Sequence, residues 1–144
     1  MMEGDARLPV VLVIEDDRAA RQLYAMMLQE SGCRVVEAHN GLQAMEKAGD
    51  LLPDAIVTDL GLPGIDGFEV CRRLQADERT RQIPVVAVTG RYVSEADVAR
   101  ARRQGCSTVL IKPFVADDLV GAVKAILDTG CSSSTSADNP PLQG

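Results

Sequence analysis

Acidic, hydroxyl and amine side chains stand at the ends of short apolar runs in this 144-residue chain. Glu15 and Asp16 follow one run, and Asp59 ends a second. Thr89 and Lys112 end two more. Carboxylates that gather closely repel one another, and a hard cation such as Mg²⁺ relieves that repulsion. A cation and a lysine beside a carboxylate can also neutralise phosphoryl oxygens, so the pattern predicts an aspartyl-phosphate site with Asp59 as the nucleophile.

These residues can meet only if the runs are neighbouring strands of one sheet. The runs cover residues 10–14, 34–38, 55–59, 85–89 and 108–112, and most are continuously apolar, as parallel strands covered on both faces are. Helical patterns alternate with them, over residues 18–31, 40–49, 67–76, 94–105 and 116–128. Strict alternation predicts an α/β fold with a doubly wound five-stranded parallel sheet and five helices. We expect the flavodoxin-like order 2-1-3-4-5, with ligands bound where strands 1 and 3 end.

Residues that start and stop helices mark the boundaries of these elements. Asp17 and Asn40 are predicted N-caps, and Ser94 precedes Asp97 at capping-box spacing. Gly32 is predicted to end the first helix. We expect one domain over residues 8–129, a short N-terminal extension over 1–7, and a tail over 130–144 that is small, polar and disordered.

Composition excludes several classes of function. The chain has 15 basic and 21 acidic residues, a net charge of −6 and few aromatic side chains, which argues against nucleic-acid binding. The longest apolar run, residues 9–14, is too short to span a membrane. The single histidine, His39, leaves no multi-histidine metal site. Four scattered cysteines predict reduced thiols of a cytoplasmic protein: Cys33, Cys71, Cys106 and Cys131.

Four motifs together resemble the receiver domain of bacterial two-component response regulators, single-domain chemotaxis-type regulators included. They are VLVIEDD (11–17), AIVTDLGLPGIDG (55–67), VVAVTG (85–90) and LIKPF (110–114), and the resemblance covers about residues 8–128. It implies a signalling phosphoacceptor rather than an enzyme. Such a domain would receive its phosphoryl group from a histidine kinase or a phosphotransfer protein, and it would signal through a downstream protein as a monomer or a phosphorylation-dependent dimer.

The resemblance also implies a role for each site residue. Asp59 matches the phosphoacceptor, and Thr89 and Lys112 match the switch hydroxyl and the phosphate-pairing lysine. The Lys112–Pro113 bond would be cis, a geometry feasible because proline follows. The implied Mg²⁺ ligands are Glu15, Asp16, Asp59 and the backbone carbonyl of Gly61. We interpret Gly61 as a point of close backbone approach, and Gly64 and Gly67 as turn residues.

One position departs from the family pattern. Val109 stands where receivers usually carry an aromatic ring that moves inward with the switch hydroxyl. Tyr92 is a possible substitute, and Val109 supports an alternative in which the chain is a phosphorylation-independent interaction module. A Mg²⁺-dependent phosphohydrolase would need a substrate pocket that these short loops do not predict. A basic cluster near the fourth helix, which is either a solvated face or an output surface, comprises Arg91, Arg100, Arg102 and Arg103.

Overall fold

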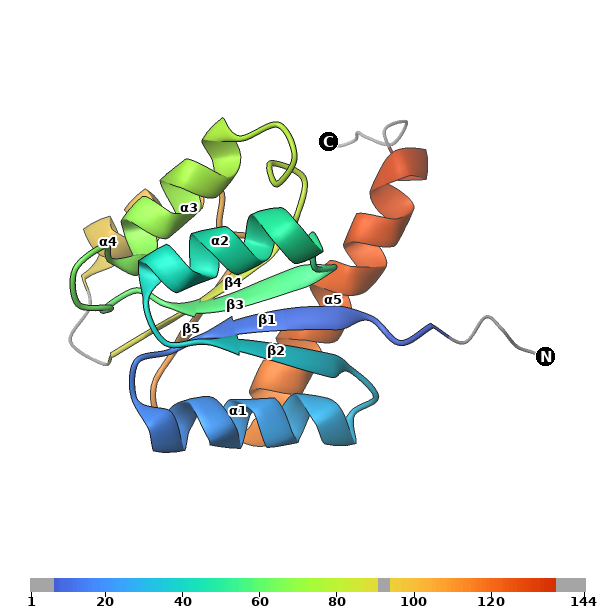
Figure 1. Ribbon diagram of the computed structural model, residues 1–144, viewed down its shortest axis with the longest axis horizontal. Coiled ribbons are helices and arrows are strands. Elements are labelled where there is room, and N and C mark those ends of the chain that lie inside the picture. The colour runs from blue at the N-terminus through green and yellow to red at the C-terminus, as the bar shows by residue number, and fades with distance from the viewer. Residues whose placement is uncertain (1–6, 91–93, 137–144) are drawn as a thin grey trace.

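The computed structural model describes residues 7–90 and 94–136, with side chains up to residue 128. Strands and helices alternate along the chain (Figure 1). The strands are β1 (Val10–Ile14), β2 (Arg34–Ala38), β3 (Ala55–Asp59), β4 (Val85–Thr89) and β5 (Thr108–Ile111). The helices are α1 (Arg18–Glu30), α2 (Gly41–Leu51), α3 (Gly67–Ala76), α4 (Glu95–Arg103) and α5 (Ala116–Ser136). The sheet is parallel with the order β2-β1-β3-β4-β5, which confirms the predicted fold class.

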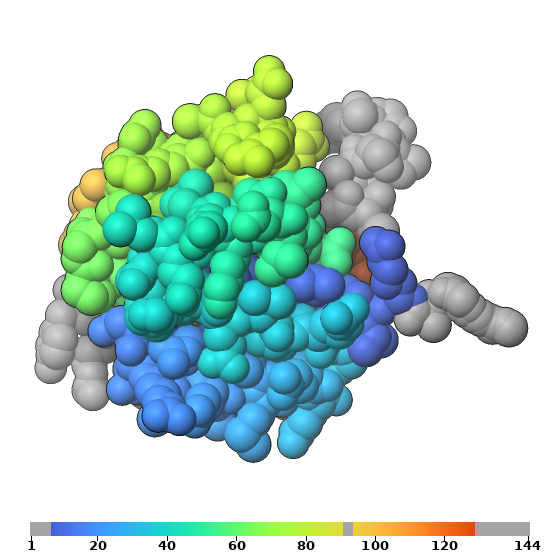
Figure 2. Space-filling view, viewed as in Figure 1, coloured from blue at the N-terminus to red at the C-terminus, as the bar shows by residue number. Residues whose placement is uncertain are grey.

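Both faces of the sheet are buried because consecutive strand residues point to opposite sides. Leu12 and Ile14 join the core beneath α2, α3 and α4, whereas Val11 and Val13 join the core beneath α1 and α5. Figure 2 shows α2 and α3 covering the first of these faces. The continuously apolar strands therefore meet the expectation of a sheet covered on both sides.

Local polar side chains fix where the helices begin. Asp17 accepts a hydrogen bond from the Ala20 amide at 2.9 Å, and Asn40 accepts one from the Gln43 amide at 2.7 Å. Ser94 and the third residue of α4 form a reciprocal capping box. Each cap satisfies amide groups that have no partner inside the helix. These three starts confirm the N-caps predicted from sequence.

The register of the sheet brings the functional strand ends to one edge. Ile14 pairs with Thr58, so the residue after β1 lies beside the end of β3. Asp59 pairs with Val88, and Thr89 pairs with Ile111. The carboxyl ends of β1, β3, β4 and β5 therefore meet at a single edge, which lies on the left of Figure 1.

Helices α1, α2 and α4 end at Glu30, Leu51 and Arg103, one or two residues from their predicted ends, and two further boundaries differ. β5 ends at Ile111, one residue before Lys112, and α5 continues to Ser136 instead of ending near residue 128. Extending an existing helix fixes one residue for each hydrogen bond gained, and serine costs little in a helix, so a polar composition alone does not stop it. Residues 130–136, expected in the tail, are thus helical, while residues 1–6, 91–93 and 137–144 lie outside the described residues, together with the predictions for Arg91 and Tyr92.

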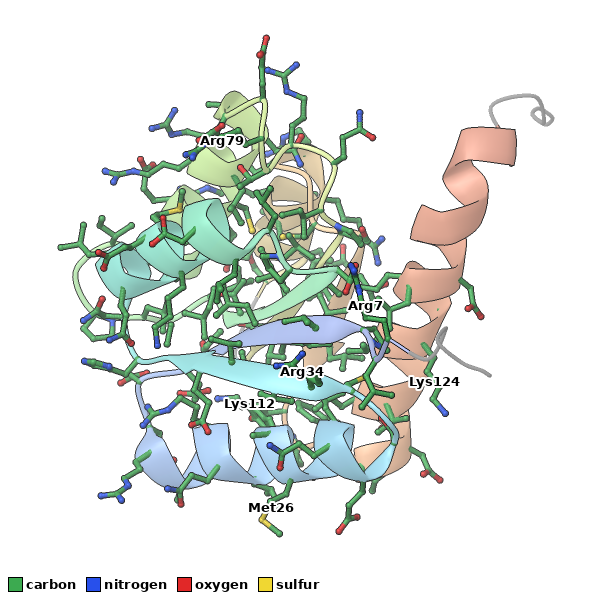
Figure 3. The ribbon with its side chains drawn as sticks, turned by 45° about the vertical axis from the view of Figure 1, so that its right-hand side comes forward. Arg7, Met26, Arg34, Arg79, Lys112 and Lys124 are labelled. Atoms are coloured by element: carbon green, nitrogen blue, oxygen red, sulfur yellow. The ribbon has the colours of Figure 1, made fainter. Side chains whose placement is uncertain are left out.

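The outer surface carries scattered apolar side chains. Met26 is 55% exposed and points away from the sheet on α1 (Figure 3). On the other side of the molecule, the guanidinium of Arg100 on α4 lies 4.1 Å from the ring centre of Phe68 on α3. One arginine of the predicted basic cluster therefore also has a packing contact. None of the helices in the described part of the chain combines the length and hydropathy needed to cross a membrane.

Candidate phosphoacceptor site

Lys112 and two carboxylates form the centre of the site at the carboxyl edge of the sheet. The Lys112 ammonium lies 2.8 Å from Oδ2 of Asp59 and 3.5 Å from Oε1 of Glu15. Glu15 is 2% exposed and Asp59 is 9% exposed. A buried charge is costly unless it is paired, so the lysine and the carboxylates stabilise one another.

Backbone amides hold each carboxylate in place. The Gly61 amide donates to Oδ1 of Asp59 at 2.7 Å, and the Asp17 amide donates to Oε2 of Glu15 at 3.1 Å. Since Oδ2 of Asp59 faces Lys112, both oxygens of Asp59 have an oriented partner. The side chain is therefore fixed before any reaction partner arrives, which reduces the entropy lost on reaction.

Three carboxylates come close enough to bind one cation together. Oxygen atoms of Glu15, Asp16 and Asp59 all lie within 4.8 Å of one another, and Asp16 is exposed. An all-oxygen, negatively charged donor set with one solvent-facing ligand suits Mg²⁺, which keeps several waters when bound. The residues at this edge therefore fit the cation predicted from sequence.

The pKa values of the site follow from burial and pairing. Burial, together with contact with Asp59, raises the pKa of Glu15 to about 7. Burial also acts to raise the pKa of Asp59, but hydrogen bonds from Glu15, Lys112 and the Gly61 amide outweigh it and hold that pKa below its usual value. Burial acts to lower the pKa of Lys112, and the two carboxylates more than reverse this. Asp59 is thus an anion beside a firmly protonated lysine, which suits a nucleophile that must accept a phosphoryl group.

The remaining residues implied by the resemblance lie at the end of β4, in β5 and directly after Lys112. Thr89 ends β4 and is 7% exposed, and its carbonyl accepts the Lys112 amide at 2.8 Å. The Lys112–Pro113 peptide bond is cis. Val109 of β5 pairs with Ala87 of β4, and its side chain packs against the core beneath α4. The position that usually holds an aromatic ring is therefore filled by a small, partly buried side chain.

The glycines after Asp59 have roles that differ from the sequence interpretation. Gly64 has φ +74°, which fits the predicted turn. Gly67 is not simply a turn residue: a Cβ there would lie 2.3 Å from the Asp59 carbonyl oxygen and 2.6 Å from Cα of Leu60. At Gly61 a Cβ would meet only Oδ1 of Asp59, at 3.4 Å. The closest backbone approach in this loop is thus at Gly67, because α3 starts directly against the end of β3.

Sequence reasoning missed two supports of the site. Arg21 on α1 donates from Nη1 to the Glu15 carbonyl at 2.8 Å and pairs with Glu37 at 3.0 Å. The rings of Tyr24 and Phe114 pack with their centres 5.6 Å apart, which joins α1 to the segment after Lys112. Arg21 follows the predicted cap Asp17 by one helical turn, so its direction toward β1 could have been inferred. The ring pair joins distant segments and leaves no periodic signal.

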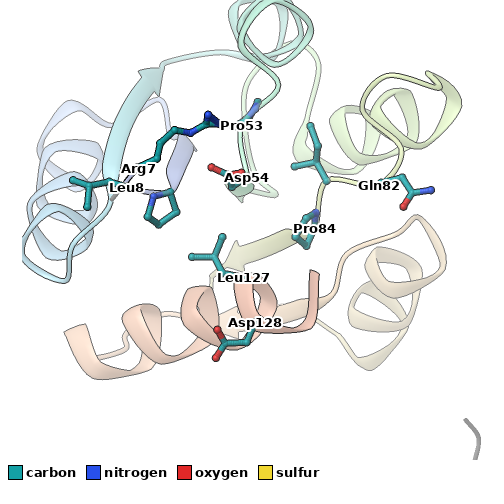
Figure 4. A pocket seen from close by; sticks show the side chains of 10 residues that line it. Arg7, Leu8, Pro53, Asp54, Gln82, Pro84, Leu127 and Asp128 are labelled. Atoms are coloured by element: carbon teal, nitrogen blue, oxygen red, sulfur yellow. The ribbon is translucent and has the colours of Figure 1, made fainter. Parts of the chain in front are cut away.

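A cavity of about 610 Å³ lies at the opposite edge of the sheet (Figure 4). Residues that precede β1, β3 and β4 form most of its wall, and α5 contributes the rest. Its lining consists of Arg7, Leu8, Pro9, Pro53, Asp54, Gln82, Ile83, Pro84, Leu127 and Asp128. Because these residues stand at the amino ends of strands, the cavity is separate from the carboxylate cluster at the carboxyl ends.

Comparisons with known proteins agree with this geometry. The chain is 32% identical over 117 residues to the polar-differentiation response regulator DivK of Brucella anthropi. This alignment covers 81% of the chain and 94% of DivK. The chain is 38% identical over 120 residues to the DNA-binding dual master transcriptional regulator RpaA of Synechocystis, which covers 83% of this chain but only 49% of RpaA. The chain therefore spans about half the length of that relative.

A solved structure and a family profile match the same region. The receiver domain of the Francisella response regulator 1452 superimposes with a TM-score of 0.76 at 26% identity, covering 83% of this chain and 97% of that one. The profile of the response regulator receiver domain matches residues 11–124. This range includes Glu15, Asp16, Asp59, Thr89 and Lys112. With the predicted fold and the carboxylate cluster both present, the chain belongs to the family of response regulator receiver domains.

Proposed function

We propose that this receiver domain accepts a phosphoryl group on Asp59 and uses it to change a protein-binding surface. The observation that carries the proposal is the arrangement of Asp59 between the Lys112 ammonium at 2.8 Å and the Gly61 amide at 2.7 Å, next to the carboxylates of Glu15 and Asp16. Receiver domains are signalling phosphoacceptors rather than catalytic enzymes.

In the proposed reaction, an oxygen of Asp59 attacks the phosphorus of a phosphohistidine. The bond from phosphorus to the histidine nitrogen breaks as the acyl phosphate forms. Lys112 pairs with a phosphoryl oxygen and exchanges its contact with the carboxylate for one with the phosphate. Glu15, Asp16, Asp59 and the Gly61 carbonyl would hold Mg²⁺, which supplies charge neutralisation at the phosphoryl oxygens.

The switch would begin at Thr89. A phosphoryl group adds negative charge and acceptor oxygens at Asp59, and the Thr89 hydroxyl at the end of β4 can donate to one of them. Movement of Thr89 would pull on the segment that leads into α4 and alter the surface formed by α4, β5 and α5. Val109 fills too little space to act as the usual aromatic ring does, so the coupling would pass through other groups on this face.

Val109 also favours a second candidate function. A receiver-like module that binds its partner without phosphorylation needs no aromatic switch, and Val109 packs into the core as an ordinary β-branched strand residue. The carboxylate and lysine cluster argues against this alternative, because nothing in simple partner binding requires it.

The proposed partners follow from the proposed chemistry. A histidine kinase or a histidine phosphotransfer protein would supply the phosphoryl group, and a downstream protein would read the altered surface. The domain would work in the cytoplasm, where such kinases present their phosphohistidine, as a monomer or a phosphorylation-dependent dimer. No direct contact with nucleic acid is part of this proposal.

The test is the intact mass of the protein after incubation with Mg²⁺ and acetyl phosphate. We expect one added phosphoryl group in the wild type and none in Asp59→Asn, and we expect the gain to disappear with a chelator. Asp17→Asn is the matched control, because it changes a carboxylate at the same edge to another good N-cap. Equal phosphorylation of wild type and Asp59→Asn would reject Asp59 as the acceptor. No added phosphoryl group in either folded protein would reject the proposal and favour the phosphorylation-independent module.

A further inference from the structure

Two cysteines that lie far apart in the sequence meet inside the core. Cys71 is on α3, and Cys106 lies between α4 and β5, 35 residues later. Their Sγ atoms are 2.9 Å apart, and the residues are 1% and 5% exposed. Both belong to the core beneath α2, α3 and α4, and neither is one of the three carboxylate-bearing residues of the site. The phosphoacceptor chemistry therefore makes no use of this thiol pair.

We propose that Cys71 and Cys106 are a modification site, a dithiol that a hydroperoxide converts to an intramolecular disulfide. A disulfide needs its sulfurs about 2.05 Å apart, so the two atoms must close a gap of only about 0.9 Å. The third described cysteine is a contrast: Sγ of Cys33 lies 3.9 Å from the Ser31 hydroxyl and has no sulfur partner among the described residues.

The chemistry is a two-electron oxidation in two steps. The Cys106 thiolate attacks one oxygen of the hydroperoxide, the O–O bond breaks, and sulfenic acid forms at Cys106 with loss of water or alcohol. Sulfur of Cys71 then attacks the sulfenic sulfur, the S–S bond forms, and the hydroxyl leaves as water with the Cys71 proton. Two thiols are oxidised to one disulfide, and the peroxide is reduced.

The surroundings assign the attacking role to Cys106. It is the more exposed of the two, and the hydrogen bond from the Cys71 thiol, which outweighs burial, lowers its pKa. The same hydrogen bond, together with burial, raises the pKa of Cys71. Of two thiols in contact, the one with the greater exposure and the lower pKa is the better attacking group, and the other is placed to resolve the sulfenic acid.

The disulfide would join two segments that flank α4. Cys71 lies in the middle of α3, and Cys106 follows the last turn of α4 and leads into β5. The cross-link would fix the distance between α3 and the start of β5, and it would close a loop that contains β4 and all of α4. Oxidation would therefore restrain α4 from its carboxyl end, opposite the end that follows Thr89.

The experiment treats the reduced full-length protein with hydrogen peroxide and blocks remaining thiols with N-ethylmaleimide after denaturation. We expect the treated protein to take up two fewer maleimide groups than the untreated protein, because one S–S bond has replaced two thiols. Trypsin should release peptides 48–72 and 104–124 joined by a disulfide. The joined pair should be lost in Cys71→Ser and in Cys106→Ser and retained in Cys33→Ser.

Peptide mapping of the wild type makes the outcome independent of how the variants fold. If Cys71 and Cys106 both carry maleimide after peroxide treatment that oxidises exposed methionines such as Met26, the pair is an inert core contact and the proposal is wrong. A disulfide that joins either cysteine to Cys33 or Cys131 would also overturn it. Because no phosphoryl donor is present, this result is separate from the test of Asp59.

Discussion

At the scale of single residues, the site is a balance between three carboxylates and one lysine. Glu15 is the least exposed of the acids, at 2%, and lies 3.5 Å from Lys112, which is closer to Asp59. With one ammonium shared between them, the two buried carboxylates cannot both be fully neutralised. Glu15 is the carboxylate whose charge is less favourable, because burial and the neighbouring Asp59 raise its pKa to about 7.

Glu15→Gln should therefore stabilise the metal-free protein at alkaline pH. Below its unfolded pKa of 4.5 the carboxyl is protonated in both states and has no effect. Between pH 4.5 and about 7 the unfolded chain loses the proton first, so the free energy of unfolding of the wild type falls as pH rises, and above pH 7 the loss is constant. We expect the glutamine variant to be more stable by on the order of 1–3 kcal/mol at pH 8, and equal at pH 4.

Urea unfolding in the presence of a chelator measures this difference, with Glu30→Gln at the exposed end of α1 as the control. Added Mg²⁺ should then stabilise the wild type and leave Glu15→Gln nearly unchanged, because a metal that binds only the folded state raises its stability. If the glutamine variant is less stable than wild type at pH 8 in chelator, ionised Glu15 stabilises the folded protein and this prediction is wrong.

At the scale of elements, the start of α3 sets where Asp59 sits. Gly67 is the first residue of this helix, and its amide donates to the Leu60 carbonyl at 3.1 Å. A Cβ at this position would overlap the Asp59 carbonyl oxygen and Cα of Leu60, both of which are backbone atoms that cannot rotate away. The helix and the strand end can therefore touch only through glycine.

Gly67→Ala should destabilise the fold by roughly 1–3 kcal/mol, the usual cost of forcing extra atoms into a filled space, and should slow phosphorylation of Asp59 by moving its backbone. Gly121→Ala is the matched control: a Cβ there meets nothing within 4 Å, and alanine in the interior of α5 should stabilise by about 0.5–1 kcal/mol. Thermal unfolding and the rate of phosphorylation by acetyl phosphate test both. Equal stability of Gly67→Ala and wild type would contradict the close approach.

The sequence predicted these elements better than it predicted contacts between them. Apolar strands and capping residues such as Asp17 and Ser94 are local signals, and they located every strand and three helix starts. The carboxylates could be placed because parallel strands end at a common edge. The approach at Gly67 and the meeting of Cys71 with Cys106 depend on how whole helices pack, and no local pattern encodes that.

At the scale of the whole molecule, the net charge of this chain is unfavourable for binding DNA. The chain carries a net charge of −6, and RpaA, of which it spans 49%, is described as DNA-binding. Duplex DNA repels an acidic surface, so this chain alone should not bind it. We expect no change in the fluorescence anisotropy of a labelled duplex up to about 0.1 mM protein at low salt, near the weak end of ordinary non-specific binding.

Binding that weakens steeply with salt would contradict this expectation and would point to arginines of α4 as a local basic contact. The triple charge reversal of Arg100, Arg102 and Arg103 to glutamate would then abolish it. Triple substitution also removes the contact between Arg100 and Phe68, so a second variant with Arg102 and Arg103 alone keeps the packing between α3 and α4 intact.

The carboxylate cluster lies where the parallel strands end, so the edge at which the strands begin takes no part in the site. β1 begins and α5 ends on the side of the molecule opposite the carboxylate cluster, as Figures 1 and 3 both show. The described chain therefore approaches β1 and leaves α5 on the side away from Asp59. A surface tether joined to that side of the molecule would leave the reactive edge facing the solution for measurements of partner capture.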